Sequence, residues 1–338
     1  MIVALVLIVL LIFSVLANFS QFVSNLVPLK SHRYAAGPRL DEVMIEDNDA
    51  KSKIAVIEVQ GIIISASLDQ GYSRAELIRA QLKRAGEDAK VKAVILKVNS
   101  PGGEVLASDE IYHAIDDFQA KSGKPVIASM GSLAASGGYY VSAPCRWIVA
   151  NELTITGSIG VIMQTWNYRG LMDKVGLAPL VFKSGKFKDM LSGSREPNEI
   201  PPEEREMVQN LINEVYGKFK TIVRDGRTQA SLANRAEGRT LDLHWQDYAD
   251  GRVLSGTEAL RLGFVDELGN FGVAVKRAKK IAGIYSANLV EYQQRRDFSD
   301  LFNLFGKTEA PTLKVDLGME MPKLQAGQLY FLSPTLVH

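Results

Sequence analysis

A serine in a turn of small residues is the group in this sequence best placed to act as a nucleophile. Ser136 lies in the run Ala-Ala-Ser-Gly-Gly-Tyr-Tyr at residues 134–140, between a strand-like apolar segment and a predicted helix. The N–H groups at a helix start lack partners and carry partial positive charge, so they could stabilise an oxyanion beside Ser136. Gly137 and Gly138 would let a substrate backbone approach closely. The alternative is that Ser136 only caps the helix.

A serine hydroxyl attacks efficiently only when a base takes its proton, and histidine is the usual base. The four histidines fall in no loop that the predicted layout brings to the serine: His32, His113, His244 and His338. A lysine can serve instead where burial lowers its pKa enough to leave the amine neutral near pH 7. Lys183, Lys186 and Lys188 lie in or beside a glycine-containing loop after a predicted strand. Taken alone, each is more often a solvated surface charge.

Alternating strand, turn and helix signals from residue 54 onward predict an α/β fold with a mainly parallel sheet covered by helices. The expected strands are 54–59, 62–64, 93–98, 125–130, 147–150, 155–163 and 179–183, and the expected helices are 74–85, 107–120, 168–175, 202–225 and 257–262. Functional loops of such sheets lie at the carboxyl ends of the strands. Both Gly-Gly turns, at 99–103 and 134–140, fall at that edge.

Composition narrows the function classes. The 39 basic and 38 acidic residues give a net charge of +1, which offers no electrostatic footprint for nucleic acid or another polyanion. The single cysteine, Cys145, excludes an internal disulfide framework and a cysteine-rich metal site. Its apolar surroundings predict a small buried side chain rather than a reactive thiol.

The first 29 residues carry no charge and are mostly apolar, so they predict a membrane anchor. A secretory signal peptide with a cleavage site at 15–17 is the alternative, although the basic N-terminal region expected of either segment is missing. Lys30, Arg33 and Arg39 would by the positive-inside rule place the bulk of the protein in the cytoplasm. The polar residues 30–53 predict a tether.

Four motifs, taken in order, closely resemble those of the signal peptide peptidase A family of membrane-anchored serine proteases. They are Asn-Ser-Pro-Gly-Gly at 99–103, Ala-Ala-Ser-Gly-Gly-Tyr at 134–139, Thr-Gly-Ser-Ile-Gly at 156–160 and Lys-Ser-Gly-Lys-Phe-Lys-Asp at 183–189. The resemblance covers about residues 54–283 and includes Gly-Phe-Val-Asp at 263–266. It implies the fold of Clp proteases and crotonases, with repeated ββα units. The implied organisation is an anchor at 1–29, a tether at 30–53, a catalytic domain at 54–284 and a C-terminal extension at 285–338.

The resemblance implies a Ser-Lys dyad without metal or cofactor. Its roles are carried over to Ser136 as nucleophile, Lys188 as general base, Ser158 as the residue that orients the lysine, and Gly103 and Gly137 as oxyanion N–H donors. Lys188 is chosen over the other two lysines of its loop because it directly precedes Asp189. The family often continues with Ser-Pro-x-Arg, where this chain has Ser-Gly-Ser-Arg at 192–195. That departure is expected to affect loop rigidity more than chemistry.

The resemblance also implies partners and a location. Short family members assemble as rings in which subunit boundaries complete the dyad, so a homo-oligomer, an octamer by analogy, is expected. The implied substrates are signal-peptide remnants at the plasma (inner) membrane, with the catalytic domain outside the cytoplasm. A crotonase-like acyl-CoA enzyme and a non-catalytic membrane scaffold are the competing hypotheses. The apolar segment 327–332 is expected to dock on a protomer.

Overall fold

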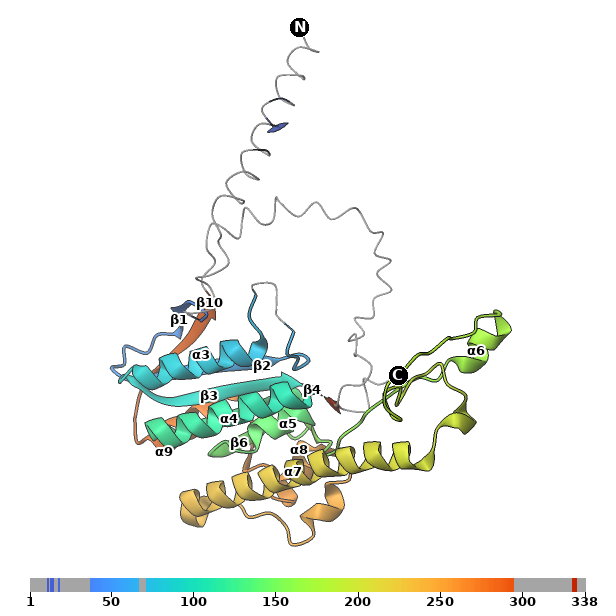
Figure 1. Ribbon diagram of the computed structural model, residues 1–338. Helices are drawn as coiled ribbons and strands as arrows, with labels where there is room; N and C mark the ends of the chain where they lie inside the picture. The colour runs from blue at the N-terminus through green and yellow to red at the C-terminus, as the bar shows by residue number, and fades with distance from the viewer. Residues whose placement is uncertain are drawn as a thin grey trace. The chain divides into compact units, whose positions relative to one another are not determined.

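The computed structural model describes residues 37–66, 71–294 and 330–332, together with Leu11, Phe13, Ser14 and Asn18 (Figure 1). The chain divides into two units, residues 1–39 and residues 40–338. The four described residues near the N-terminus are helical, and the Asn18 side-chain amide donates to the Ser14 carbonyl oxygen at 2.8 Å. Within the described part of the chain, no helix has the length and apolar character needed to cross a membrane. Most of the predicted anchor, residues 1–29, lies outside the described residues.

A nine-stranded, mostly parallel sheet lies at the centre of the second unit (Figure 1). In spatial order its strands are β1 (Leu40–Glu46), β10 (Asn288–Gln294), β2 (Lys53–Gln60), β3 (Val91–Ser100), β5 (Val126–Ala135), β6 (Trp147–Ala150) and β9 (Glu267–Leu268), with β7 (Ile155–Gly157) beside β5 and β8 (Val253–Ser255) beside β7. Only the β1–β10 and β7–β8 pairs of this sheet are antiparallel. The prediction of an α/β fold with a mainly parallel sheet is therefore confirmed.

Helices cover both faces of the sheet. The described helices of the second unit are α3 (Arg74–Glu87), α4 (Val105–Ser122), α5 (Gly137–Ser142), α6 (Arg169–Lys174), α7 (Pro202–Asn234), α8 (Gly256–Arg261) and α9 (Phe271–Ala282), with short 3-10 helices at Pro197–Glu199, Arg235–Glu237 and Trp245–Tyr248. Of these, α6 lies away from the sheet (Figure 1). Successive side chains of a strand point to opposite faces. In β3, Val94 and Leu96 join the core formed with α3 and α4, whereas Ala93 and Ile95 join the core formed with α9.

The ends of the helices follow from local sequence. Ser73 and Glu76 form a capping box at the start of α3, in which each side chain accepts a backbone N–H of the other residue. The Asn270 side chain accepts from the Val273 N–H at the start of α9. Gly123 and Gly283 end α4 and α9 in the left-handed conformation that glycine adopts without strain.

Two strands of the sheet lie outside the predicted catalytic domain. β1 falls within the segment predicted to be a tether, and β10 lies beyond the predicted boundary at residue 284. Both escaped prediction because β1 is an edge strand with mostly exposed side chains and β10 carries several polar residues. The sheet is therefore wider than the periodicity of the sequence indicates.

Four of the predicted strands differ from the structure. The segment 62–64 forms only an isolated bridge, in which Ile63 pairs with Gly103. β5 continues past Met130 to Ala135, because its last residues pair with β7 instead of forming the expected loop. The strand predicted at 155–163 ends at Gly157. The segment 179–183 forms no strand, because its apolar side chains are exposed and no described strand lies beside it; Phe182 is 89% exposed.

Candidate active site

Ser136 stands at the junction between β5 and α5, where it is the N-cap residue of the helix. Its φ of 54° is uncommon for a residue with a side chain, and such strained conformations concentrate at functional sites. The Ser136 N–H donates to the Gly157 carbonyl oxygen at 2.8 Å, which fixes the turn to β7. Its hydroxyl is fully buried and has no hydrogen-bond partner among the described residues. Ser136 therefore holds the N-cap position, but its side chain makes no capping hydrogen bond.

The start of α5 lies directly against the short strand β4 (Gly102–Glu104). A Cβ on Gly137 would lie 3.0 Å from the Gly102 Cα and 3.2 Å from the Gly103 nitrogen. A Cβ on Gly103 would lie 1.9 Å from the Ile63 carbonyl oxygen. Only glycine fits these positions. The structure therefore brings together the two Gly-Gly motifs that the sequence analysis placed at one edge.

Two backbone N–H groups at this junction are used neither by Ile63 nor within helix α5. Ile63 pairs with β4 by donating to the Gly102 carbonyl oxygen and accepting from the Glu104 N–H, at 2.9 and 2.7 Å. In a parallel ladder this pattern turns the N–H and C=O of Gly103 to the opposite side. Gly137 is the first residue of α5, so its N–H has no partner within the helix. The side of Gly103 that faces away from Ile63 lies against β11 (Tyr330–Leu332), whose Phe331 pairs with it. The roles of Gly103 and Gly137 as oxyanion donors stay predictions.

Ser158 is held close to the Ser136 turn by the pairing of β5 with β7. Ala135 pairs with Gly157, and Ser158 follows directly. Ser158 is buried, has a φ of 51°, and donates its N–H to the Arg252 carbonyl oxygen at 2.7 Å. The predicted role of Ser158 in orienting the lysine is compatible with this place but is not tested by it.

The Lys188 side chain makes no hydrogen bond with Ser136 in the described chain. It belongs to the segment between β7 and α7, which extends away from the sheet with α6 near its end (Figure 1). The Lys188 side chain is exposed and makes no hydrogen bond or ion pair with any described residue. The structure therefore brings four of the predicted residues together: Ser136, Ser158, Gly103 and Gly137. The predicted base, Lys188, is not bonded to them within one chain.

The loop that carries Lys188 is fixed to the first turn of α7 by a chain of ion pairs. Lys183 Nζ lies 2.6 Å from Asp189 Oδ1, and this hydrogen bond holds the pKa of Asp189 below its ordinary value. Arg195 Nη1 lies 3.7 Å from Asp189 and 2.6 Å from Glu204 Oε1. Glu204 is buried. Arg195 thus links the loop to the helix. The sequence analysis named this residue only as part of the Ser-Gly-Ser-Arg departure from the family pattern.

The Arg195→Ala variant is expected to loosen this loop, because it leaves the buried Glu204 carboxylate without its ion-pair partner. Chymotrypsin cleavage after the exposed Phe182 should become roughly tenfold faster, since cleavage follows local opening. Arg205→Ala removes an exposed arginine beside Glu204 and should leave the rate unchanged. Equal cleavage rates in all three proteins would mean that the ion pairs do not hold the loop.

Exposed apolar side chains gather on the segment between β7 and α7. They are Trp166, Tyr168, Leu171, Val175, Leu177, Leu180, Val181 and Phe182. Soluble proteins rarely expose so many large apolar groups on one short segment unless they meet a partner. The segment that carries the predicted base therefore also carries a large group of exposed apolar side chains.

Cys145 is fully buried, as predicted, and burial raises the pKa of its thiol to about 12. The thiol therefore stays protonated at pH 8, and a protonated buried thiol is unreactive. Alkylation of the native protein by iodoacetamide is expected to be at least ~100-fold slower than in urea. Because Cys145 is the sole cysteine, one mass measurement reports the result. Rapid stoichiometric labelling of the native chain would contradict this prediction.

Behind α5 lies a buried ion pair that the sequence did not reveal. Arg227 of α7 pairs with Asp266 and donates to the Cys145 carbonyl oxygen at 3.1 Å. Asp266 also accepts the Ile148 N–H at 2.8 Å. The Gly-Phe-Val-Asp motif at 263–266 is therefore a structural support of the segment that follows α5. An arginine at helical spacing on the apolar side of α7 was the only available signal.

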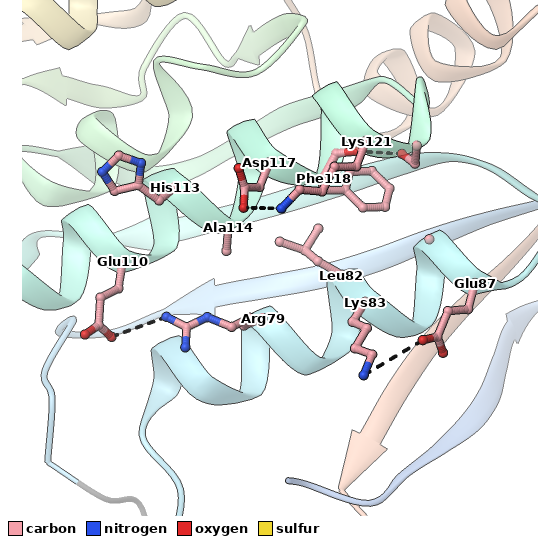
Figure 2. Close-up of a pocket in the computed structure, with 12 residues that line it drawn as sticks. Arg79, Leu82, Lys83, Glu87, Glu110, His113, Ala114, Asp117, Phe118 and Lys121 are labelled. Carbon is pink, nitrogen blue, oxygen red and sulfur yellow. Dashed lines mark hydrogen bonds and ion pairs between the residues drawn. The ribbon is translucent and has the colours of Figure 1, made fainter. Parts of the chain in front are cut away.

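A surface groove of about 690 Å³ lies between α3 and α4, away from these residues. Figure 2 shows its charged rim, in which Arg79 faces Glu110 across the two helices and Lys83 faces Glu87 along α3. None of the predicted site residues lines it. The groove is therefore not the candidate active site.

Comparisons with known proteins match this chain to two protease families. The model of peptidase family S49 matches residues 119–285, and that of the Clp protease family matches residues 47–150. A protein of Enterococcus faecium named as a signal peptide peptidase SppA is 35% identical, over 75% of this chain and 71% of that protein. A protein of Synechocystis named as a protease is 38% identical, over 80% of this chain and 89% of that protein. The solved structure of a membrane-bound stomatin-specific protease gives a TM-score of 0.40 at 17% identity, covering 70% of this chain and 93% of that one.

The family models and the named relatives identify this chain as a serine protease with a Clp-protease-like α/β fold. The chain belongs to peptidase family S49, the signal peptide peptidase A family that its motifs resemble. The recognition made from the sequence is thereby confirmed.

Proposed function

We propose that this chain is an endopeptidase with a Ser-Lys dyad. The neutral amine of Lys188 takes the proton of the Ser136 hydroxyl, and Ser136 attacks a peptide carbonyl. The N–H groups of Gly103 and Gly137 stabilise the oxyanion, each contributing ~3 kcal/mol. Lys188 then returns the proton to the leaving amine, and water hydrolyses the acyl-enzyme. The observation that carries the proposal is the conformation of Ser136 beside Gly103 and Gly137. Its backbone has a positive φ, and its buried hydroxyl has no hydrogen-bond partner among the described residues.

We further propose that the dyad forms between subunits of a homo-oligomer, with Ser158 orienting the incoming lysine. The exposed apolar segment around α6 and the exposed Lys188 support this assignment, because packing on a neighbouring copy would bury both. Burial also disfavours the charged form of an amine, as a general base requires. Eight copies remain the expected number by analogy.

The proposed substrates are extended apolar peptides such as signal-peptide remnants, since relatives carry the name signal peptide peptidase. The proposed location is the plasma (inner) membrane, with residues 1–29 as a single-pass anchor and the catalytic domain outside the cytoplasm. The uncharged, apolar sequence of residues 1–29 supports this proposal.

A fluorophosphonate probe tests the dyad on the full chain purified in detergent. Wild type should form a covalent adduct, while Ser136→Ala and Lys188→Ala should form none. Lys186→Ala removes an exposed lysine of the same loop and should label like wild type. Labelling that survives in Lys188→Ala would mean that another base serves Ser136. An oligomeric wild type that never labels would favour the scaffold hypothesis.

A further inference from the structure

The helix that follows Ser136 is too short to fix its own orientation. α5 has six residues, and its N-cap residue Ser136 makes no capping hydrogen bond. A helix of fewer than two turns is not stable through its own backbone bonds, so contacts from outside must hold it. The Tyr140 N–H donates to the Ser136 carbonyl oxygen at 2.8 Å. A contact that fixes Tyr140 therefore also acts on the backbone of the proposed nucleophile.

Two neighbouring tyrosines connect α5 to different parts of the fold. The Tyr139 hydroxyl donates to the Phe264 carbonyl oxygen at 2.8 Å, and the Tyr140 hydroxyl donates to Asp109 Oδ1 of α4 at 2.6 Å. Burial, together with the hydrogen bond to Asp109, raises the pKa of the Tyr140 phenol, so the hydroxyl stays a donor near neutral pH. Hydrogen bonds to a carboxylate are stronger than those between neutral groups. The Tyr140 bond is therefore the stronger kind of the two.

Asp109 is in turn held by groups of α4 and α7. Its Oδ2 lies 2.7 Å from Lys218 Nζ of α7 and 3.5 Å from His113 Nε2 of α4. The next residue of α7, Phe219, packs its ring against the Tyr140 ring, with centroids 4.9 Å apart. One carboxylate therefore links α4, α5 and α7, and its second oxygen is already fixed when the first accepts the tyrosine.

Helix α4 contacts α5 near both of its ends. At the start of α5, a Cβ on Gly137 would lie 2.7 Å from Ser108 Oγ, in the residue before Asp109. One turn further along α5, Tyr140 bonds Asp109 and also packs edge-on against the Tyr112 ring, with centroids 5.8 Å apart. The close contact at Gly137 limits how near α5 can approach, and the bond to Asp109 limits how far it can move away.

We propose that Asp109 and Tyr140 are positioning residues for Ser136: the carboxylate holds α5, and through it the serine turn, in the orientation that attack requires. This inference rests on the proposed function and adds two residues that touch neither the substrate nor the reacting atoms. Ser136 has a φ of 54°, a conformation that persists only while its surroundings enforce it. A misplacement of about 1 Å can slow a reaction by up to ~10²-fold. Substrate binding should be unchanged, because no binding group is lost.

The variant Tyr140→Phe tests the inference on the full chain in detergent, because it removes the hydroxyl and keeps the ring. Below the melting transition, kcat for an apolar reporter peptide and the rate of fluorophosphonate labelling of Ser136 should each fall roughly tenfold at unchanged KM. Tyr112→Phe is the matched control, since the Tyr112 hydroxyl bonds no described residue, and it should leave both rates unchanged. Asp109→Ala should resemble Tyr140→Phe, whereas Asp109→Asn keeps an oxygen acceptor and should recover at least half of the wild-type rate.

Hydrogen exchange of the α5 amides separates this inference from the proposed function, because it needs no catalysis. Exchange should be roughly tenfold faster in Tyr140→Phe and Asp109→Ala than in wild type and Tyr112→Phe. Faster exchange with unchanged labelling and kcat would reduce the pair to a structural support and overturn the positioning role, as would unchanged exchange. If wild type neither labels nor hydrolyses peptides while exchange responds as expected, the peptidase proposal alone is overturned, and the hold of Asp109 on the serine turn is sustained.

Discussion

Mixing the inactive variants Ser136→Ala and Lys188→Ala within one oligomer is expected to restore peptide hydrolysis. If each site draws its serine from one subunit and its lysine from a neighbour, random mixing leaves about one quarter of the sites intact. Activity would then rise from background to about a quarter of the wild-type rate. The reason lies in the fold: Ser136 is buried at the sheet, whereas the Lys188 side chain is exposed on a segment rich in exposed apolar residues and makes no hydrogen bond or ion pair with a described residue.

The control for this experiment is a chain that carries both substitutions. Mixing the double variant with either single variant supplies only one of the two groups, so no activity should return. Co-purification of differently tagged subunits shows that mixing took place. Mixed oligomers that stay inactive would place both groups of each dyad in one chain, and the segment around Lys188 would then have to move toward its own Ser136.

Much of the sheet side of the site was predictable from the sequence, because its signals are local. Gly103 and Gly137 stand where two backbones touch, and a residue with a Cβ fits neither position. Ser136 follows a run of small buried residues and begins a helix. Strand β3 is a nearly continuous apolar run that fits burial on both faces, and helix α3 carries apolar residues at helical spacing that fit one buried face. Such features need no knowledge of distant contacts.

The elements that escaped prediction depend on partners far away in the sequence. β10 becomes a strand because β1 and β2 lie on its two sides, not because its own pattern is strong. The segment 179–183 has a strand-like composition but no described neighbour to pair with. Whether Lys188 serves Ser136 is a question about assembly, which sequence motifs imply only by resemblance.

The periodicity of the long helix α7 does not reveal that the helix also supports the core. The sequence predicts a helix to about residue 225, but α7 continues to Asn234 and carries Arg227 into the core beside Cys145. From the sequence alone, Arg227 interrupts the apolar face of the helix. Its place in the core is explained only by its ion-pair partner, Asp266. Through Arg227, this ion pair joins α7 to the residue before β9 and to the Cys145 carbonyl oxygen in the segment after α5.

Replacing Arg227 by methionine is therefore expected to destabilise the protein strongly. The substitution keeps the length of the side chain but leaves the Asp266 carboxylate, which has no exposed surface, without its charged partner. Removing one member of a buried ion pair costs ~3–5 kcal/mol. For a domain of this size the thermal midpoint should fall on the order of 10 °C. Differential scanning fluorimetry of the full chain in detergent measures this shift.

Arg224→Met supplies the matched control one turn earlier in α7. Arg224 is exposed and pairs with its neighbour Asp225 at the surface, where such pairs contribute ~0–1 kcal/mol. Its thermal midpoint should stay within ~2 °C of wild type. If both variants melt alike, the Arg227–Asp266 pair is not what fixes α7 to the sheet. If only Arg227→Met loses stability and its Ser136 labels more slowly below the melting transition, the pair also supports the geometry of the nucleophile turn.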